Sequence, residues 1–244
     1  MGAGTFAIGG DLVVNRLGFG AMRVLGRARS SGEPEDRKYP LRLIRRAVEL
    51  GINLIDTAYV YAHGMSEELI ADALHPYPLE LVIATKGGID GSGQDARPET
   101  LRRQCEESLA RLRLERIDLY QLHRVDPNVP LEESIGELAR LREEGKIRHV
   151  GLSNVDVAQL HRAQAVVPIV SVQNEYSIGN RADEETVDEC ERQGIAYLPW
   201  APLRGSDPET ALVWLLHRSR VICPIPGTSS IEHLEENVRA AAKA

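Results

Sequence analysis

Several features that would place a chain in a special class are scarce in this sequence. Its three cysteines are far apart and form no CxxC pair, which argues against a disulfide framework and against a zinc site, so no metal centre is expected. No apolar run approaches the roughly 18 residues that cross a membrane. The start, MGAGTFAIGG, lacks the basic and apolar regions of a signal peptide. We therefore expect a reduced, cytoplasmic protein with no membrane segment.

An excess of basic residues is also missing. Lys and Arg number 29 against 36 Asp and Glu, so the formal net charge is −7. That sign is opposite to the electrostatic footprint of a nucleic-acid-binding protein. Apolar residues at 43% and charged residues at 27% are typical of a globular protein. The composition predicts a globular chain that binds no nucleic acid, although local basic groups could still hold a small anionic ligand.

The chain alternates short aliphatic runs with stretches of helical periodicity. In the helical stretches, apolar residues recur on one face, as at Ile135, Leu138 and Leu141. Many of the runs are apolar on both sides, as expected for strands of a parallel sheet covered by helices. Eight strand–helix units in order predict an α/β fold, a (β/α)8 TIM barrel. The eight runs span residues 16–22, 53–58, 81–86, 117–123, 147–153, 169–175, 195–201 and 221–226.

The sequence ahead of the barrel, TFAIGGDLVV, predicts an N-terminal β-hairpin that turns at Gly9, Gly10 and Asp11. No GxGxxG motif follows the first strand, which argues against a doubly wound sheet. Because there is no Ser/Pro-rich linker and no break in composition, residues 1–244 are expected to form one domain. The longest irregular stretch, residues 24–40, is predicted to be a solvated loop on the catalytic face.

Ionisable side chains stand at the carboxyl ends of three consecutive predicted strands. Asp56 ends the second strand, Lys86 the third and His123 the fourth, while Tyr61 lies just beyond Asp56. In a barrel these ends converge on one mouth, where active sites of this fold are built. Each residue alone has an ordinary interpretation, because Asp56 could cap a helix, Lys86 could be a rim charge and His123 could be a satisfied core histidine. Their conjunction favours a functional site.

This group of side chains suits proton transfer to an oxygen atom. A tyrosine hydroxyl has a pKa near ~10, and an adjacent ammonium would stabilise the phenolate and lower that value. Tyr61 would then be a usable general acid, with Asp56 holding Lys86 as its ion-pair partner. The alternative from these residues is a barrel aldolase or lyase in which Lys86 forms a Schiff base, and the nearby carboxylate argues against it.

Three of the later strand ends offer groups for a flat ring that bears a carboxamide. Ser153, Asn154 and Gln173 carry hydroxyl and carboxamide groups that could pair with it, and Trp200 offers an aromatic face for stacking. Two structural alternatives stay open. Ser153 and Asn154 could form the N-cap of the following helix, and Trp200 could pack at the barrel top.

The turn after the eighth run, residues 226–232, opens a helix with small residues. Ser229 is the expected N-cap and Glu232 its reciprocal partner. Free backbone N–H groups and the helix dipole make such a turn a ready phosphate site. A well-capped helix with no ligand is the alternative.

These residues lie in long, ordered motifs that resemble the aldo-keto reductase superfamily, in its bacterial-type oxidoreductase branch. The resemblance implies hydride transfer from a nicotinamide C4 to the carbonyl carbon of a small aldehyde or ketone, with Tyr61 donating the proton. The catalytic tetrad implied by it is Asp56, Tyr61, Lys86 and His123. The motifs run from about Phe6 to Ala240 and include GINLIDTAYVYAHGMSEELIADAL (51–74), ATKGG (84–88), RIDLYQLHRVDP (116–127), EEGKIRHVGLSN (143–154), VQNEYS (172–177) and PIPGTSSIEHLEENV (224–238).

The same resemblance implies a site for NADPH. Residues 20–22 would lie beneath the nicotinamide, residues 201–203 would follow the pyrophosphate, and residues from 227 onward would surround the adenosine phosphate. The set implied to bind the cofactor is Gly20, Ala21, Met22, Asp56, Ser153, Asn154, Gln173, Trp200, Ala201, Pro202, Leu203, Gly227, Thr228, Ser229, His233, Glu236 and Asn237.

Two departures from the family pattern bear on the cofactor. Many relatives carry a lysine and an arginine around the 2′-phosphate, where this chain has Gly227 and His233. NADH therefore remains possible, and binding of NADPH relative to NADH should improve as pH falls through the titration of His233. The connection from Trp200 to Asp207, the expected N-cap of the next helix, is shorter than in relatives, which usually carry an extra helix and loop there.

The sequence also ends just after the eighth helix, without the C-terminal tail of many relatives. An open mouth, weak cofactor retention and broad substrate tolerance are therefore expected. The favoured function is an NADP-dependent carbonyl reductase that acts on a small substrate as a monomer. The alternative is a barrel that binds nicotinamide with little turnover, as a sensor or regulatory subunit, and the missing loop is its main support.

Overall fold

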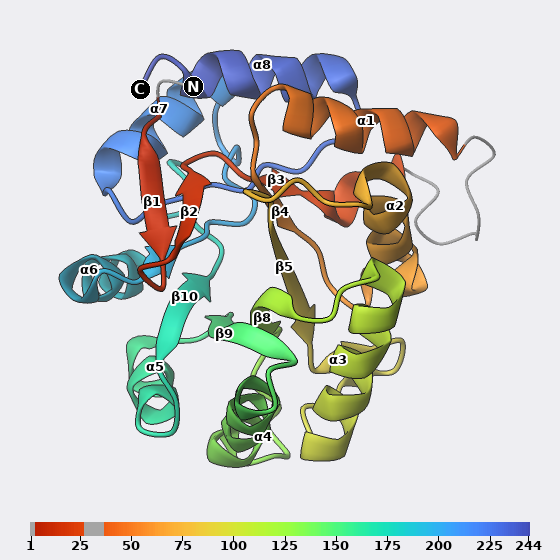
Figure 1. The fold of residues 1–244 in the computed structure, drawn as a ribbon. Coiled ribbons are helices and arrows are strands. Elements are labelled where there is room, and N and C mark those ends of the chain that lie inside the picture. The colour runs from red at the N-terminus through yellow and green to blue at the C-terminus, as the bar shows by residue number, and fades with distance from the viewer. Residues whose placement is uncertain (1–2, 27–36) are drawn as a thin grey trace.

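The computed structural model describes residues 3–26 and 37–244. Seven parallel strands form a curled sheet in the order β11-β10-β9-β8-β5-β4-β3, and the helices lie outside it (Figure 1). The alternation of runs in the sequence is thus confirmed as an α/β TIM-like barrel. The strands are β3 (Phe19–Gly20), β4 (Leu54–Asp56), β5 (Val82–Gly87), β8 (Ile117–Leu122), β9 (Ile147–Ser153), β10 (Ile169–Gln173) and β11 (Ala196–Tyr197).

The helices follow the strands one by one and bury one face against them. In α1, for example, Leu43, Ile44 and Ala47 are fully buried, whereas Arg45 points to solvent. Polar side chains cap the amino ends of three helices: Asp156 accepts a hydrogen bond from Gln159 N–H, Asp207 accepts one from Thr210 N–H, and Ser230 caps α8. The helices are α1 (Lys38–Glu49), α2 (Met65–Leu74), α3 (Pro98–Leu112), α4 (Leu131–Glu143), α5 (Val157–Gln164), α6 (Glu184–Gln193), α7 (Pro208–Arg218) and α8 (Ile231–Ala241).

The eighth run, residues 221–226, is not a strand, so that prediction is wrong. Pro224 and Pro226 have no N–H to donate to a ladder. The segment still contacts both outer strands of the sheet. Cys223 N–H donates to the carbonyl oxygen of Tyr197 in β11 at 2.8 Å, and Gly20 N–H in β3 donates to the carbonyl oxygen of Pro226 at 3.3 Å. The segment therefore fills the space between β11 and β3.

The predicted N-terminal hairpin is confirmed as β1 (Thr5–Ile8) and β2 (Leu12–Asn15), with Gly9 and Gly10 in the left-handed region of the turn. Its apolar face packs against Leu54 and Val82, which are the first residues of β4 and β5. The side chain of Asn53, just before β4, donates to the carbonyl oxygen of Val13 at 2.9 Å. The hairpin thus covers the amino end of the sheet and leaves the carboxyl ends of the strands for a site.

Two local predictions are corrected. Of the segment 24–40, predicted as a loop, residues 38–40 begin α1, where Pro40 stands in the first turn and its missing N–H disrupts no helical bond; residues 27–36 lie outside the described residues. The interpretation of Ser153 and Asn154 as an N-cap is wrong, because Asp156 caps α5. After β5, a small antiparallel pair follows, β6 (Ile89–Asp90) and β7 (Gly93–Gln94).

Candidate active site

A buried ion pair joins the carboxyl ends of β4 and β5. Lys86 Nζ donates to Asp56 Oδ2 at 2.7 Å and to the carbonyl oxygen of Thr57 at 2.8 Å. Lys86 is fully buried, and burial alone would lower its pKa, but the negative charge and hydrogen bond of Asp56 outweigh burial, so the pKa of Lys86 is raised. Lys86 therefore stays an ammonium, which speaks against the Schiff-base alternative because that chemistry needs a neutral amine.

The second oxygen of Asp56 is held by two carboxamides. Gln173 Nε2 donates to Asp56 Oδ1 at 2.7 Å, and Gln121 Nε2 donates to the same atom at 3.3 Å. Gln173 is one of the predicted residues, whereas sequence reasoning missed Gln121. Its position could have been found, because it lies two residues before His123, and alternate residues of a strand face the same side.

Tyr61 and His123 complete a compact group with this ion pair. Lys86 Nζ donates to the Tyr61 hydroxyl at 3.4 Å and lies 5.0 Å from the centre of its ring. The ring of His123 meets that of Tyr61 edge-on, with centroids 5.7 Å apart. Burial, then the positive charges of Lys86 and Arg124, lower the pKa of His123 to about 3. The structure thus brings the four predicted catalytic side chains together, with His123 neutral and Lys86 charged.

Tyr61 opens a strained turn, Tyr61–Gly64, between β4 and α2. Ala62 and His63 both have left-handed backbone conformations, with φ of 50° and 55°, and Gly64 follows with φ of 91°. A left-handed conformation costs free energy for residues other than glycine. Surrounding contacts must therefore hold the turn.

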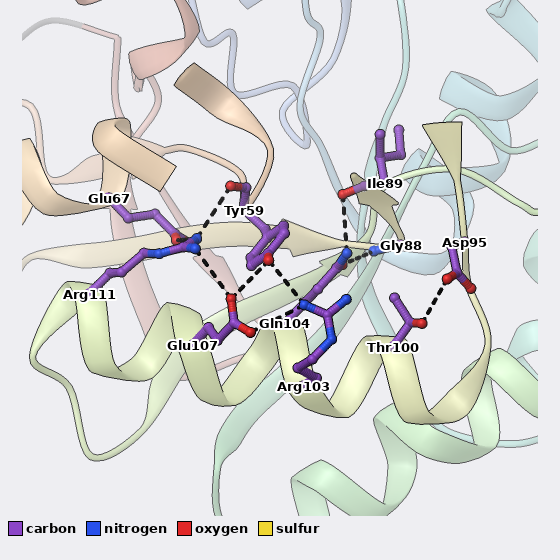
Figure 2. A network of polar contacts seen from close by, with 10 residues as sticks. All are labelled: Tyr59, Glu67, Gly88, Ile89, Asp95, Thr100, Arg103, Gln104, Glu107 and Arg111. Carbon is purple, nitrogen blue, oxygen red and sulfur yellow. Dashed lines mark hydrogen bonds and ion pairs between the residues drawn. The ribbon is translucent and has the colours of Figure 1, made fainter. Parts of the chain in front are cut away.

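Side chains of α3 supply such support through a network of polar contacts with the residues on either side of the turn, and Figure 2 shows the contacts of Tyr59 and Glu67 with α3. Arg111 Nη1 lies 3.3 Å from Glu67 Oε2 and 3.5 Å from the carbonyl oxygen of Tyr59, and its guanidinium stacks on the Tyr59 ring. The Tyr59 hydroxyl donates to Glu107 Oε2 at 2.8 Å. A Cβ atom added to Gly64 would lie 2.5 Å from the Arg111 guanidinium, so this arginine packs directly against the turn.

A cavity of about 580 Å³ opens at the carboxyl ends of the strands beside Tyr61 and His123. Lys86 lies behind its wall, and Ala21, predicted to lie beneath the nicotinamide, is fully buried and does not line it. The predicted residues that line the cavity are Gly20, Met22, Asp56, Tyr61, His123, Ser153, Asn154, Gln173, Trp200, Ala201, Pro202, Leu203 and Gly227. Pro226, in the turn 226–232 predicted to bind a phosphate, also lines it. Sequence reasoning missed four lining residues, Arg23, Arg124, Arg204 and Ile225.

Asn154 ties three neighbouring strand ends together in the cavity wall. Its Nδ2 donates to the carbonyl oxygen of His123 at 3.1 Å and to Ser153 Oγ at 2.9 Å, and its N–H donates to the carbonyl oxygen of Gln173 at 3.0 Å. The left-handed φ of 58° at Asn154 is one that asparagine tolerates better than most residues. These contacts place Ser153, Asn154 and Gln173 beside one another.

The start of α8 differs from its prediction in two respects. Ser230, not Ser229, is the N-cap, and its Oγ accepts a hydrogen bond from His233 N–H at 3.2 Å. The N–H of Ile231 donates to the Tyr39 hydroxyl at 3.2 Å. The amide of Ile231, in the turn predicted to bind a phosphate, is therefore in use, as is the amide of His233, and the exposed side chains here include Ser229, Glu232 and His233.

The remaining predicted residues lie on α8 and in the turn before it, outside the cavity. Thr228 is buried and binds within the turn, because its hydroxyl accepts a hydrogen bond from Ser230 N–H at 3.0 Å. Glu236 is exposed. Asn237 is 3% exposed, and its Oδ1 has no hydrogen-bond partner among the described residues. A buried oxygen without a donor is costly, so this atom fits a site that a ligand completes.

The described residues offer few other chemically reactive groups. No group of three or more His, Cys, Asp or Glu side chains among residues 3–26 and 37–244 is placed to hold a metal ion. The three cysteines are free and buried, and burial raises the pKa of Cys105 to about 12, which makes it a poor nucleophile. No described helix is long and apolar enough to cross a membrane.

Comparison with known proteins points to one family. Residues 16–207 match the Aldo/keto reductase family. An uncharacterized oxidoreductase of Schizosaccharomyces pombe is 44% identical over 98% of this chain and 85% of its own length. Pyridoxine 4-dehydrogenase of Escherichia coli is 37% identical over 98% of this chain and 93% of its own length.

Solved structures show the same similarity in three dimensions. A glycerol dehydrogenase from Gluconobacter oxydans has a TM-score of 0.89 and 27% identity, and the match covers 100% of this chain and 91% of that one. An aldo/keto reductase from Klebsiella pneumoniae in complex with NADP and acetate has a TM-score of 0.80 and 25% identity, over 97% of this chain and 89% of that one.

Proposed function

Because this chain belongs to the aldo/keto reductase family and is an oxidoreductase, we propose that it reduces small aldehydes or ketones to alcohols with NADPH. The observation that carries the proposal is the group of Tyr61, Lys86, Asp56 and His123 beside a cavity large enough for a nicotinamide and a small substrate. We further propose that residues 1–244 act as one domain.

Tyr61 is the proposed proton donor to the carbonyl oxygen. Tyr61 lines the cavity, and the Lys86 ammonium beside its hydroxyl would stabilise the phenolate that forms when the proton leaves. Asp56 keeps Lys86 charged and in place. His123 is neutral, so it can hydrogen-bond to the substrate oxygen without competing as an acid near neutral pH.

The cavity residues fit a nicotinamide dinucleotide, which supplies the hydride when bound. Ser153 and Asn154 offer donors and acceptors for its carboxamide, and Trp200 offers an aromatic face. Residues 201–203 and Arg23 line the way towards α8, where the phosphates would lie. The unpartnered Oδ1 of Asn237 fits the amino group of an adenine.

The single most useful experiment is a fluorescence titration with NADPH and NADH, followed by turnover of both cofactors with a panel of neutral aldehydes. We expect NADPH binding and its oxidation by at least one aldehyde. Pyridoxine and glycerol enter the panel in the oxidation direction because the two dehydrogenase relatives are named for them.

The outcomes separate the proposed function from its alternative. Tight NADPH binding with no turnover of any carbonyl compound would favour a sensor or regulatory role. Absence of binding to either cofactor would contradict both.

A further inference from the structure

The cavity wall carries a positive charge that the rest of the chain does not share. Its charged lining residues are Arg23, Arg124, Arg204 and Asp56, and the charge of Asp56 is neutralised by Lys86. The chain as a whole has a formal net charge of −7. A cavity with excess arginine in an acidic protein selects anionic ligands.

The three arginines differ in their surroundings. Arg204 is paired with Glu175, with Nη1 2.5 Å from Oε1. Arg23 lies beside the turn that precedes α8, since its Cβ is 4.0 Å from where a Cβ of Gly227 would be, so we assign its charge to the proposed cofactor phosphates. Arg204 therefore has an ion-pair partner, and Arg23 has a proposed one.

Arg124 has neither. It directly follows His123 at the carboxyl end of β8, is exposed and lines the cavity. No described residue makes a hydrogen bond or an ion pair with it. Its charge is felt at the reacting centre, because it contributes to the lowered pKa of His123.

We infer that Arg124 binds a carboxylate or phosphate group on the carbonyl substrate, so that the preferred substrates are anionic aldehydes or ketones. A guanidinium suits this role because its planar fork pairs with both oxygens of such a group. Arg124 is then a specificity-determining residue that touches the substrate away from the carbonyl. This inference rests on the proposed function, whose own test uses neutral aldehydes.

The test compares substrates that differ only in the anionic group. Succinic semialdehyde is paired with butanal, and glyceraldehyde phosphate with glyceraldehyde, for the wild type and for Arg124→Met and Arg124→Lys. We expect Arg124→Met to lower kcat/KM for one or both anionic substrates by about ten-fold, mainly through KM. Arg124→Lys should recover part of the loss, and the neutral partners should be unaffected. Which anionic substrate responds tells whether a carboxylate or a phosphate is preferred.

Three results would overturn the inference. Equal losses for charged and neutral substrates would show a structural role, and unchanged kinetics for both anionic substrates would show that Arg124 does not contact the substrate. A weaker NADPH affinity of Arg124→Met in a fluorescence titration would assign the arginine to the cofactor. Failure of the wild type to reduce butanal or glyceraldehyde while reducing their charged partners would strengthen the inference, whereas no turnover of any of the four would contradict the proposed function itself.

Discussion

The two ends of the proposed cofactor site differ in how their polar groups are satisfied. At the tetrad end, formed by Asp56, Tyr61, Lys86 and His123, the buried charges of Lys86 and Asp56 are paired and further hydrogen-bonded. At the α8 end, formed by Thr228, Ser229, His233 and Asn237, polar groups are exposed, bound within the turn or, at Asn237 Oδ1, without a partner among the described residues.

This difference separates chemistry from binding. The tetrad end is assembled by the protein alone, as preorganised catalysis requires, whereas the α8 end is the part that we propose a ligand completes. Substitutions at the first should therefore change turnover and stability, and substitutions at the second should change affinity alone.

The largest effect is expected for Tyr61→Phe. Loss of the proton donor should lower kcat for aldehyde reduction by roughly 1,000-fold, while the dissociation constant for NADPH stays nearly unchanged. Steady-state kinetics and fluorescence titration measure the two quantities. If the variant retained most of its turnover, Tyr61 would not be the proton donor, and the tetrad end would not be the part of the site that controls turnover.

Lys86→Met tests whether the same residue at the tetrad end contributes both to turnover and to the stability of the fold. The substitution leaves Asp56 buried without its cation, so we expect a loss of about 3–5 kcal/mol in the free energy of unfolding and a loss of turnover of roughly 100-fold. Urea unfolding and steady-state kinetics check both. The matched double variant Asp56→Asn/Lys86→Met should recover stability but not turnover, and recovery of both would contradict the role of the ammonium.

Arg111→Met tests the support of the turn Tyr61–Gly64 from outside the cavity. Glu67 would be left buried without its partner, and the turn would lose a packing contact, so we expect about 3 kcal/mol of destabilisation and roughly ten-fold lower kcat. Adding Glu67→Gln should restore stability, while kcat stays low. A variant with normal kcat at a temperature where it is folded would show that the network is only structural.

Asn237→Ala should give the smallest effect, confined to affinity. Because Oδ1 has no partner among the described residues, its loss should not lower the free energy of unfolding, but NADPH and NADH should both bind about five-fold more weakly. Arg239→Ala, an exposed position on the same helix, serves as the control. His233→Ala should weaken NADPH alone, and equal effects on both cofactors would place His233 away from the 2′-phosphate.

The sequence predicts the tetrad end well for a physical reason. Asp56, Lys86 and His123 end neighbouring parallel strands, and the geometry of a parallel sheet brings such ends together without further information. The same reasoning reaches Gln121 once strand alternation is applied to β8.

The α8 end and the arginines could not be predicted in the same way. The N-cap of α8 is Ser230 and not the predicted Ser229. The hydroxyl of Tyr39, which is distant in the sequence, accepts a hydrogen bond from the N–H of Ile231, and no local pattern predicts that contact. The eighth run is apolar like a strand, yet Pro224 and Pro226 remove two of the N–H donors that a strand would use. Whether Arg124 has an ion-pair partner depends on all the residues around the cavity, and a local sequence pattern does not reveal which residues those are.

The pH dependence of turnover tests the central claim, that Tyr61 and not His123 donates the proton. The pKa of His123 near 3 lies below its ordinary value of about 6.5, so the imidazole gains no proton between about pH 8 and pH 5. With saturating NADPH, kcat of the wild type should be constant across that range and fall only at alkaline pH, as Tyr61 loses its proton. The residual rate of Tyr61→Phe should lack that alkaline fall. A decline in kcat centred near about pH 6.5 that persists in Tyr61→Phe would make His123 the acid and contradict the account.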